Sequence, residues 1–323
     1  MRSNQYIIGI ILLVVITGLS FFLLKGNKKD DSKPPVSVNS DTEFAEDSPV
    51  FATDPSRRQD DALSKIPLIL PVPEKLSFAG EEVPLDDPDV RERFEKELYI
   101  TAHRYYQVMF YMKRGPRILP YLAEELRKAD MPEDFIYLSV IESDLIPTIR
   151  SPKGALGLWQ FMPATGRRFG LKVNRYIDER MHVEKSTEAA IQFLKNAKEK
   201  TGSWTLASAA YNMGLARTLR TMESQKTDNY YKMYLNPETA RYVFKILAAK
   251  VIIENPKRYG YSIPDDEVYR REPFKKVEVN GGITSMAEWA DKRGFNYYDI
   301  KKLNPWIKGQ RLPEGEFTVK LPK

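Results

Sequence analysis

The chain has 323 residues, of which 42% are hydrophobic and 11% aromatic, so it can bury the core of one domain and of a smaller second one. It holds no Cys and only two His, which excludes thiol nucleophiles, Cys-based zinc sites and a lipid-modified Cys; we expect neither a metal nor a cofactor. The net charge is +6, yet the 50 Lys and Arg are scattered among 44 acidic residues without a basic run, so we expect no nucleic-acid partner.

The chain begins with an uncharged apolar run of 19 residues, Tyr6 to Leu24, flanked by Arg2 and Lys25. This length suffices for a membrane-spanning helix. The only weak cleavage site, Gly18-Leu-Ser20, is followed by further apolar residues. We therefore predict an uncleaved membrane anchor over residues 1–25; a cleaved export signal is the alternative.

Residues 26–65 are rich in Asp, Ser, Pro and Lys, and we predict a disordered linker there. The next stretch, 66–88, carries four Pro among short apolar pieces and should lie extended on the domain.

Apolar residues then recur at helical spacing, which predicts a mainly helical domain over residues 66–262. Caps and breakers give the bounds of its helices, such as Ser203 before the helix that starts at 204 and Asn236-Pro237 at the start of the last one. The predicted helices cover 89–113, 116–128, 134–141, a segment from Ser186 or Thr187 to Lys200, 204–212 and 237–254.

The helix over 134–141 is apolar nearly all round, so Glu142 at its end should lie in the core or at a cleft. Burial without a cation raises a carboxyl pKa and keeps the group protonated near neutrality, as a general acid requires. A surface Glu at a helix end is the plain alternative.

Three further segments carry candidate site residues. In the loop after Glu142, alternation places Gln160 and Met162 on one face, while Ser151 could bind the acid or a ligand, or could simply form a turn. Tyr211 could stack its ring on a ligand or be a buried Tyr with a backbone partner. Glu238 and Tyr242 lie one turn apart on the last helix, on a face that should look into the cleft.

Four ordered blocks give the span from about 120 to 260 a family resemblance: Glu142-Ser143, 157–163 (GLWQFMP), 210–212 (AYN) and 238–242 (ETARY). It resembles the lysozyme-like lytic transglycosylases that cut peptidoglycan, most closely the membrane-bound type D enzymes. The resemblance implies that Glu142 is the catalytic acid and base. It also implies a substrate-binding cleft lined by Ser151, Gln160, Met162, Tyr211, Asn212, Glu238 and Tyr242.

The chemistry implied by the resemblance needs one carboxyl. It protonates the glycosidic oxygen and then helps the muramic O6 close a 1,6-anhydro ring. Most glycosidases use two carboxyls. Asp144 should point away from Glu142 because two residues rotate a helix by about 200°, whereas Glu238 and Asp178 remain possible partners. The alternatives are a water-using muramidase or chitinase and a non-catalytic peptidoglycan-binding scaffold.

The C-terminal segment is predicted to form a connector, 263–273, and a small unit, 274–323, with two strands around two short helices. Ser285 with Glu288 forms a capping box that marks the start of the first of these helices. This βααβ pattern resembles a LysM module, which binds N-acetylglucosamine polymers. It departs from that family at Gly281-Gly282-Ile283, so a docked appendage without sugar affinity is the alternative.

The resemblance implies a place in the bacterial cell envelope, anchored in the inner membrane with the catalytic domain in the periplasm and peptidoglycan strands as partner. The Lys residues after the apolar run instead favour a cytoplasmic C-terminal flank. On the strength of the catalytic resemblance, we predict a catalytic domain in the periplasm despite this charge pattern.

Overall fold

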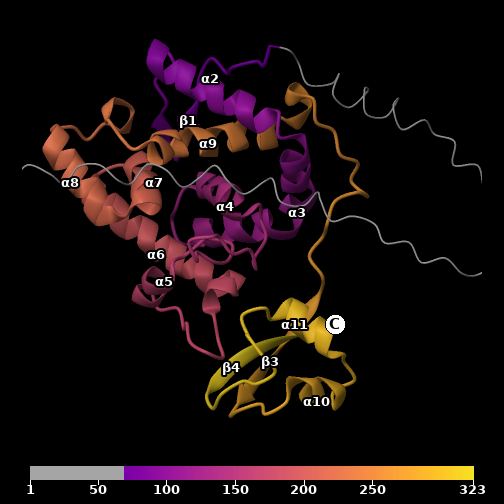
Figure 1. Cartoon of the computed structure of the whole chain (residues 1–323). Helices are drawn as coiled ribbons and strands as arrows, with labels where there is room; N and C mark the ends of the chain where they lie inside the picture. Colours follow the sequence, from indigo (N-terminus) through magenta and orange to yellow (C-terminus); the bar gives the residue numbers. More distant parts are fainter. Residues whose placement is uncertain (1–68) are drawn as a thin grey trace, which may run out of the picture. The chain divides into compact units, whose positions relative to one another are not determined.

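The computed structural model describes residues 69–323 and shows a mainly helical domain followed by a small strand and helix module (Figure 1). The predicted anchor and the whole of the predicted linker lie outside the described residues. Within 69–323, no helix combines the length and the apolar character needed to cross a membrane.

The segment before the first helix lies against the domain, as predicted. It forms a short hairpin of β1 (Ser77–Phe78) and β2 (Glu81–Glu82). Its apolar side chains, including the fully buried Phe78, join the main core. The Glu81 carboxylate accepts hydrogen bonds from the first backbone N–H groups of α7, at 2.9 Å from Thr205, and so ties the hairpin to a helix N-terminus.

The first two helices differ from the prediction. Helix α2 (Pro88–Ala102) ends well before residue 113, and α3 (Tyr105–Lys128) continues through Pro116 and Pro120. The break is tertiary in origin: Arg104 leaves the helical conformation where the buried Tyr261 hydroxyl donates to the Ala102 carbonyl. The apolar face of α3 stays buried, which holds the helix together across its two Pro residues.

The remaining helices surround a buried central one. A 3₁₀ turn, η1 (Glu133–Phe135), leads into α4 (Ile136–Ser143), which packs against α3 and α9. Figure 1 shows α2 and α9 side by side, and the contacts agree. The others are α5 (Pro163–Arg168), η2 (Glu179–Met181), α6 (Val183–Thr201), α7 (Trp204–Met213), α8 (Leu215–Gln225), η3 (Tyr230–Lys232), α9 (Pro237–Glu254) and η4 (Pro256–Tyr259).

The predicted bounds of these helices vary in accuracy. Helix α9 begins and ends where its Asn-Pro cap and apolar pattern predicted, but α6 begins three residues before Ser186, and α8 was not predicted. Inside α6, the hydroxyls of Ser186 and Thr187 donate back to the Val183 carbonyl instead of capping the helix.

The C-terminal module consists of β3 (Phe274–Asn280), α10 (Met286–Asp291), α11 (Tyr297–Leu303) and β4 (Glu316–Pro322). The two strands pair antiparallel with Val277 opposite Val319. The predicted mainly helical fold with a βααβ module is thus confirmed. At the unusual Gly281-Gly282-Ile283, Ile283 is buried and exchanges two backbone hydrogen bonds with Leu312, of 2.8 and 2.9 Å.

The module is docked on the helical domain. The Asp178 N–H donates to the Trp306 carbonyl and the Lys308 N–H to the Tyr176 carbonyl, each at 2.8 Å. Ile177, 1% exposed, packs into the apolar core of the module. The connector also touches the domain, since the Tyr269 N–H donates to the Lys113 carbonyl at 2.7 Å.

Candidate active site

Helix α4 carries Glu142 in its last turn. The helix is buried because its apolar residues, such as Leu138 and Val140, lie in the main core on both sides. The partly buried Glu142 side chain faces a cavity of about 590 Å³. Its carboxylate accepts a hydrogen bond from the Tyr242 hydroxyl of α9, so its single described hydrogen-bond partner is a neutral group.

The environment of Glu142 favours its protonated form. Burial raises the pKa of the carboxyl, and the nearby charge of Glu238 raises it further. The Tyr242 hydrogen bond and the positive charge of Lys245 oppose these effects. The result is a pKa of about 7, so protonated and ionised Glu142 coexist near neutrality.

The chain leaves α4 through two successive left-handed residues, Asp144 (φ 51°) and Leu145 (φ 58°). This conformation is unfavourable for a branched side chain, and α3 holds it in place. Gln107 Nε2 donates to the Asp144 carboxylate at 2.7 Å, and Arg114 Nη1 donates to the Asp144 carbonyl at 3.0 Å. Asp144 is therefore occupied by α3 and does not serve Glu142.

The cavity brings together segments that are distant in sequence: the end of α4, the loop 151–162, the end of α7 and the start of α9. Of the eight residues predicted for the site, seven line it: Glu142, Ser151, Gln160, Met162, Tyr211, Asn212 and Glu238. The eighth, Tyr242, is 4% exposed and reaches the site through its hydrogen bond to Glu142.

Two of the loop residues are tied to the backbone. Gln160 adopts a left-handed conformation (φ 48°), and its Nε2 donates to the carbonyls of Ile149 and Gly157 at 3.1 and 2.8 Å. This leaves the Gln160 Oε1 to accept from a ligand. Ser151 Oγ accepts from the Ala155 N–H at 3.0 Å, and no hydrogen bond joins it to Glu142 in the described region. Ser151 thus forms a turn and keeps its hydroxyl proton for a ligand.

The helix residues at the cavity are also linked to one another. The Tyr211 hydroxyl donates to the Trp159 carbonyl at 2.7 Å, which is the backbone partner weighed against sugar stacking. Asn212 Nδ2 donates to Glu238 at 3.3 Å, while its Oδ1 accepts from Thr239 at 2.6 Å. These bonds join α7 to α9 beside the acid.

Arg180, which supports the loop 151–162 (the cleft loop), was not predicted as a site residue. Its guanidinium binds the buried Asp178 carboxylate at 2.7 Å and donates to the carbonyls of Gly154 and Phe161 at 3.0 and 2.9 Å. Asp178 is thereby neutralised and lies outside the cavity, so it is no candidate for a second carboxylate. The only sequence signal was a short Asp-x-Arg spacing, which is common on solvated turns.

The loop approaches Arg180 closely at Gly157. A Cβ on this residue would lie 1.8 Å from the Arg180 carbonyl oxygen, and its φ of 91° is left-handed. Glycine is therefore required at this position. Further residues that were not predicted as site residues also line the cavity, among them Lys153, Phe193 and Arg217.

Metal binding finds no support in the described residues, where no group of three His, Asp or Glu is placed to hold an ion. The site offers one acid of raised pKa, one exposed carboxylate at Glu238 (62% exposed), and amide and hydroxyl groups suited to polar, uncharged ligands.

Comparisons with known proteins give matches to two domain families and to several curated proteins. The family described as Transglycosylase SLT domain matches residues 121–234, and Soluble lytic transglycosylase C-terminal LysM-like domain matches 275–323. Membrane-bound lytic murein transglycosylase D of Escherichia coli strain K12 is 31% identical over 278 residues, which cover 84% of this chain and 60% of that protein. The chain thus spans about three fifths of that relative's length.

Two other similarities are more limited. A putative tributyltin chloride resistance protein of Alteromonas sp. strain M-1 is 34% identical over 114 residues, which cover 35% of this chain and 55% of that protein. Among solved structures, the 70 kDa soluble lytic transglycosylase of Escherichia coli shares 22% identity over 47% of this chain and 26% of that chain, with a TM-score of 0.36.

Proposed function

Residues 121–234 belong to the transglycosylase SLT domain family and 275–323 to the LysM-like domain family of soluble lytic transglycosylases, and we propose that the chain is a peptidoglycan lytic transglycosylase. The observation that carries the proposal is Glu142: a carboxyl with a pKa of about 7 that faces a cavity and is hydrogen-bonded by a neutral phenol. A carboxyl in this state can give a proton and take one back near neutrality.

In the proposed reaction, Glu142 gives its proton to the glycosidic oxygen between N-acetylmuramic acid and N-acetylglucosamine, and the bond from that oxygen to C1 breaks. The substrate's N-acetyl group stabilises the developing positive charge at C1. The Glu142 carboxylate then takes the proton of the muramic O6 as O6 bonds to C1. This closes the 1,6-anhydro ring and returns Glu142 to its starting state without consuming water.

The other residues would bind the glycan or hold the acid in place. The Gln160 Oε1, the Ser151 hydroxyl and the exposed Met162 face the cavity, where they could receive an acetamide and a sugar ring. Tyr242 would tune Glu142, while Tyr211 would fix the loop through Trp159. Asn212 and Glu238 would present polar groups at the other wall of the cavity.

Product analysis tests the proposed function. Muropeptides released from purified sacculi should carry 1,6-anhydromuramic ends, lighter by one water than hydrolytic ends, as measured by mass spectrometry. The Glu142→Gln protein should release almost none. Reducing-end muramic acid in the wild-type digest would instead identify a hydrolase and direct attention to Glu238, the other carboxylate that lines the cavity.

We also propose the predicted organisation of the chain: an anchor at 1–25, a linker at 26–65, the catalytic domain at 66–262, a connector at 263–273 and the glycan-binding module at 274–323. The proposed location is the periplasmic face of the inner membrane. A periplasmic reporter fused after Leu321 should be active and a cytoplasmic one silent. The reverse result would remove both the location and access to the substrate.

A further inference from the structure

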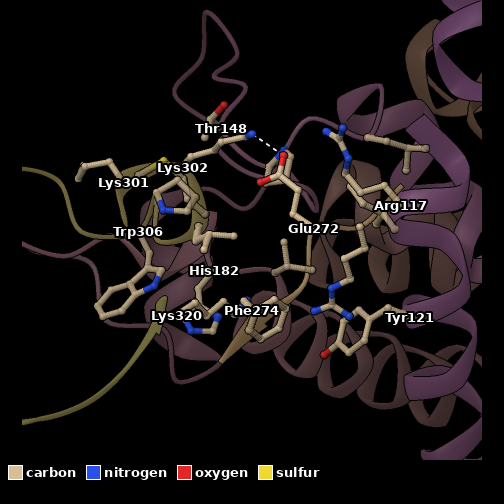
Figure 2. A pocket seen from close by; sticks show the side chains of 18 of the residues that line it. Arg117, Tyr121, Thr148, His182, Glu272, Phe274, Lys301, Lys302, Trp306 and Lys320 are labelled. Atoms are coloured by element: carbon tan, nitrogen blue, oxygen red, sulfur yellow. Dashed lines mark hydrogen bonds and ion pairs between the residues drawn. The ribbon is translucent and has the colours of Figure 1, made fainter. Parts of the chain in front are cut away.

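A second cavity of about 590 Å³ lies where the C-terminal module meets the helical domain, and it shares no residue with the cavity at Glu142 (Figure 2). The helical domain contributes α3 and two segments, 145–148 and 181–183. The connector and β3 contribute 271–274, and the module contributes residues of α11, the turn after it and β4. The cavity exists only when the module is docked.

Positive charge dominates the lining. Five side chains are cationic and one is acidic: Arg117, Arg271, Lys301, Lys302 and Lys320, against Glu272. Figure 2 shows the ion pair of Lys302 with Glu272. Lys320 and Arg271 pair with Glu184 at 2.6 and 3.2 Å.

Two of these cations remain available to a ligand. Arg117 and Lys301 form no ion pair with any residue of the described range. Arg117 is exposed, and Lys301 donates to the Ile307 carbonyl. Burial lowers the pKa of Lys301, a cost that an anion beside its ammonium would offset. The lining therefore carries positive charge that the described residues do not pair, and this charge favours an anionic ligand.

The walls between these charges are aromatic and apolar. The rings of Tyr121, Phe274 and Trp306 line the cavity together with Leu145 and Pro147. The Arg271 guanidinium lies 4.9 Å from the centroids of both the Tyr121 and the Phe274 ring, which fixes its direction. A ligand that fits must combine anionic groups with small apolar surfaces.

We propose that this cavity binds a short peptide with two or more carboxylates, the chemistry of the peptide stems of murein. The identification with stems rests on the proposed function, which brings the chain to that polymer. A phosphate polymer would satisfy the cations but leave the apolar walls without a partner, whereas a peptide with carboxylates and methyl groups uses both.

The cavity is linked to the candidate active site by the segment that follows Glu142. Leu145, Pro147 and Thr148 line it and belong to the segment that follows Glu142. The same segment continues to Ile149, whose carbonyl accepts from Gln160 Nε2 in the cleft loop at 3.1 Å. A peptide in the cavity thus contacts the chain between the acid and the loop, and the protein distinguishes strands with peptides from bare strands.

Binding can be measured without turnover. The probe is the free tetrapeptide stem released from murein by an amidase, titrated calorimetrically into the full-length Glu142→Gln protein in mild detergent. We expect saturable binding that weakens at least ~10-fold when Arg117→Gln and Lys301→Gln are added, since each removes a charge-assisted hydrogen bond. The matched control, Lys96→Gln with Lys200→Gln, removes two exposed charges outside the cavity and should bind as before.

Three outcomes would overturn the proposal: no binding of the tetrapeptide, equal binding by the cavity variant and its control, or equal binding of the peptide with esterified carboxylates. Displacement of the peptide by equimolar polyphosphate would reassign the cavity to a phosphate polymer. If the double variant unfolds, the single variant Arg117→Gln, at an exposed residue, tests the proposal with a smaller expected loss of affinity for the peptide. Because no bond is cleaved, failure of the proposed reaction would leave this result unchanged.

Discussion

Two glutamates in different regions of the molecule show how partners decide what a buried carboxylate does. Glu142 lies at the end of α4 and accepts from the phenol of Tyr242. Glu184 lies in the first turn of α6, where the module docks, and contacts Lys320, Arg271 and His182. Burial alone would raise the pKa of both groups.

The outcomes are opposite. Glu142 reaches a pKa of about 7, whereas hydrogen bonds from His182 and Lys320 hold the pKa of Glu184 well below its usual range. Glu184 is therefore ionised at every pH at which the protein is expected to work and joins the two parts of the chain. The comparison teaches that chemistry follows from the charge of the nearest donors rather than from burial alone.

The largest effect is expected for Glu142→Gln. The variant keeps the shape of the side chain but has no proton to give, so turnover on soluble glycan fragments should fall at least ~10²- to 10⁴-fold. Binding of the same fragments should persist. Turnover equal to that of the wild type would mean that another group is the acid.

The same variant should also change stability with pH. Because the folded pKa of Glu142 lies above its ordinary 4.5, the folded wild type holds more protons than the unfolded chain between pH 4.5 and 7, and its stability falls across that window. Glu142→Gln should not show this loss, and its free energy of unfolding above pH 7 should exceed that of the wild type by up to about 3 kcal/mol. Chemical denaturation at pH 4 and pH 8 measures the difference.

Glu184→Gln should behave in the opposite way. It leaves Lys320 and Arg271 without a carboxylate, at a cost of about 3 kcal/mol in the free energy of unfolding at pH 7. Because the folded pKa is lowered, the wild type's advantage is complete above the ordinary value of 4.5 and shrinks as the pH falls below it. Turnover on soluble fragments should change little. If Glu184→Gln were still less stable than the wild type by the same amount at pH 3, the ionised Glu184 carboxylate would not be the source of the difference.

A smaller effect is expected for Tyr242→Phe. It removes the hydrogen bond that favours ionised Glu142, so the alkaline limb of kcat/KM should move up by about one pH unit. Tyr211→Phe is the matched control, because the Tyr211 hydroxyl donates to the Trp159 carbonyl instead of to the acid. If the alkaline limb of kcat/KM does not move in Tyr242→Phe, the Tyr242 hydroxyl does not affect the pKa of Glu142.

The smallest effect is expected for Glu238→Gln. The charge of Glu238 raises the pKa of Glu142, but its side chain is 62% exposed and screened by salt. The alkaline limb should therefore move down by only a few tenths of a unit, and less at high ionic strength. Complete loss of activity would assign Glu238 the role of a second catalytic carboxylate.

Local signals predicted much of the fold. Asn236-Pro237 marked the start of α9, Ser203 capped α7, and Ser285 with Glu288 marked α10. The break at Arg104 had no local signal, because its cause is Tyr261, more than 150 residues away in sequence. Pro116 suggested a helix start, but the buried face of α3 outweighs the hydrogen bond that this Pro removes.

The site was predictable as a set of residues but not as a network. Sequence blocks selected the residues that line the cavity, since each carries chemistry at a helix end or loop. They could not show that Gln160 donates hydrogen bonds to the backbone or that Asp178 forms an ion pair with Arg180, because these contacts depend on how distant segments pack. The docking of the module on Ile177 was hidden for the same reason.

Arg180 also has a mechanical consequence. Its guanidinium holds Asp178 and two carbonyls of the cleft loop, while the Asp178 N–H holds the Trp306 carbonyl of the module. If the module holds a glycan strand, as proposed above, tension on that strand would reach the cleft loop through Asp178, Arg180 and their hydrogen bonds. A stretched wall and a slack one would then present this protein with different forces on the loop that lines its cleft.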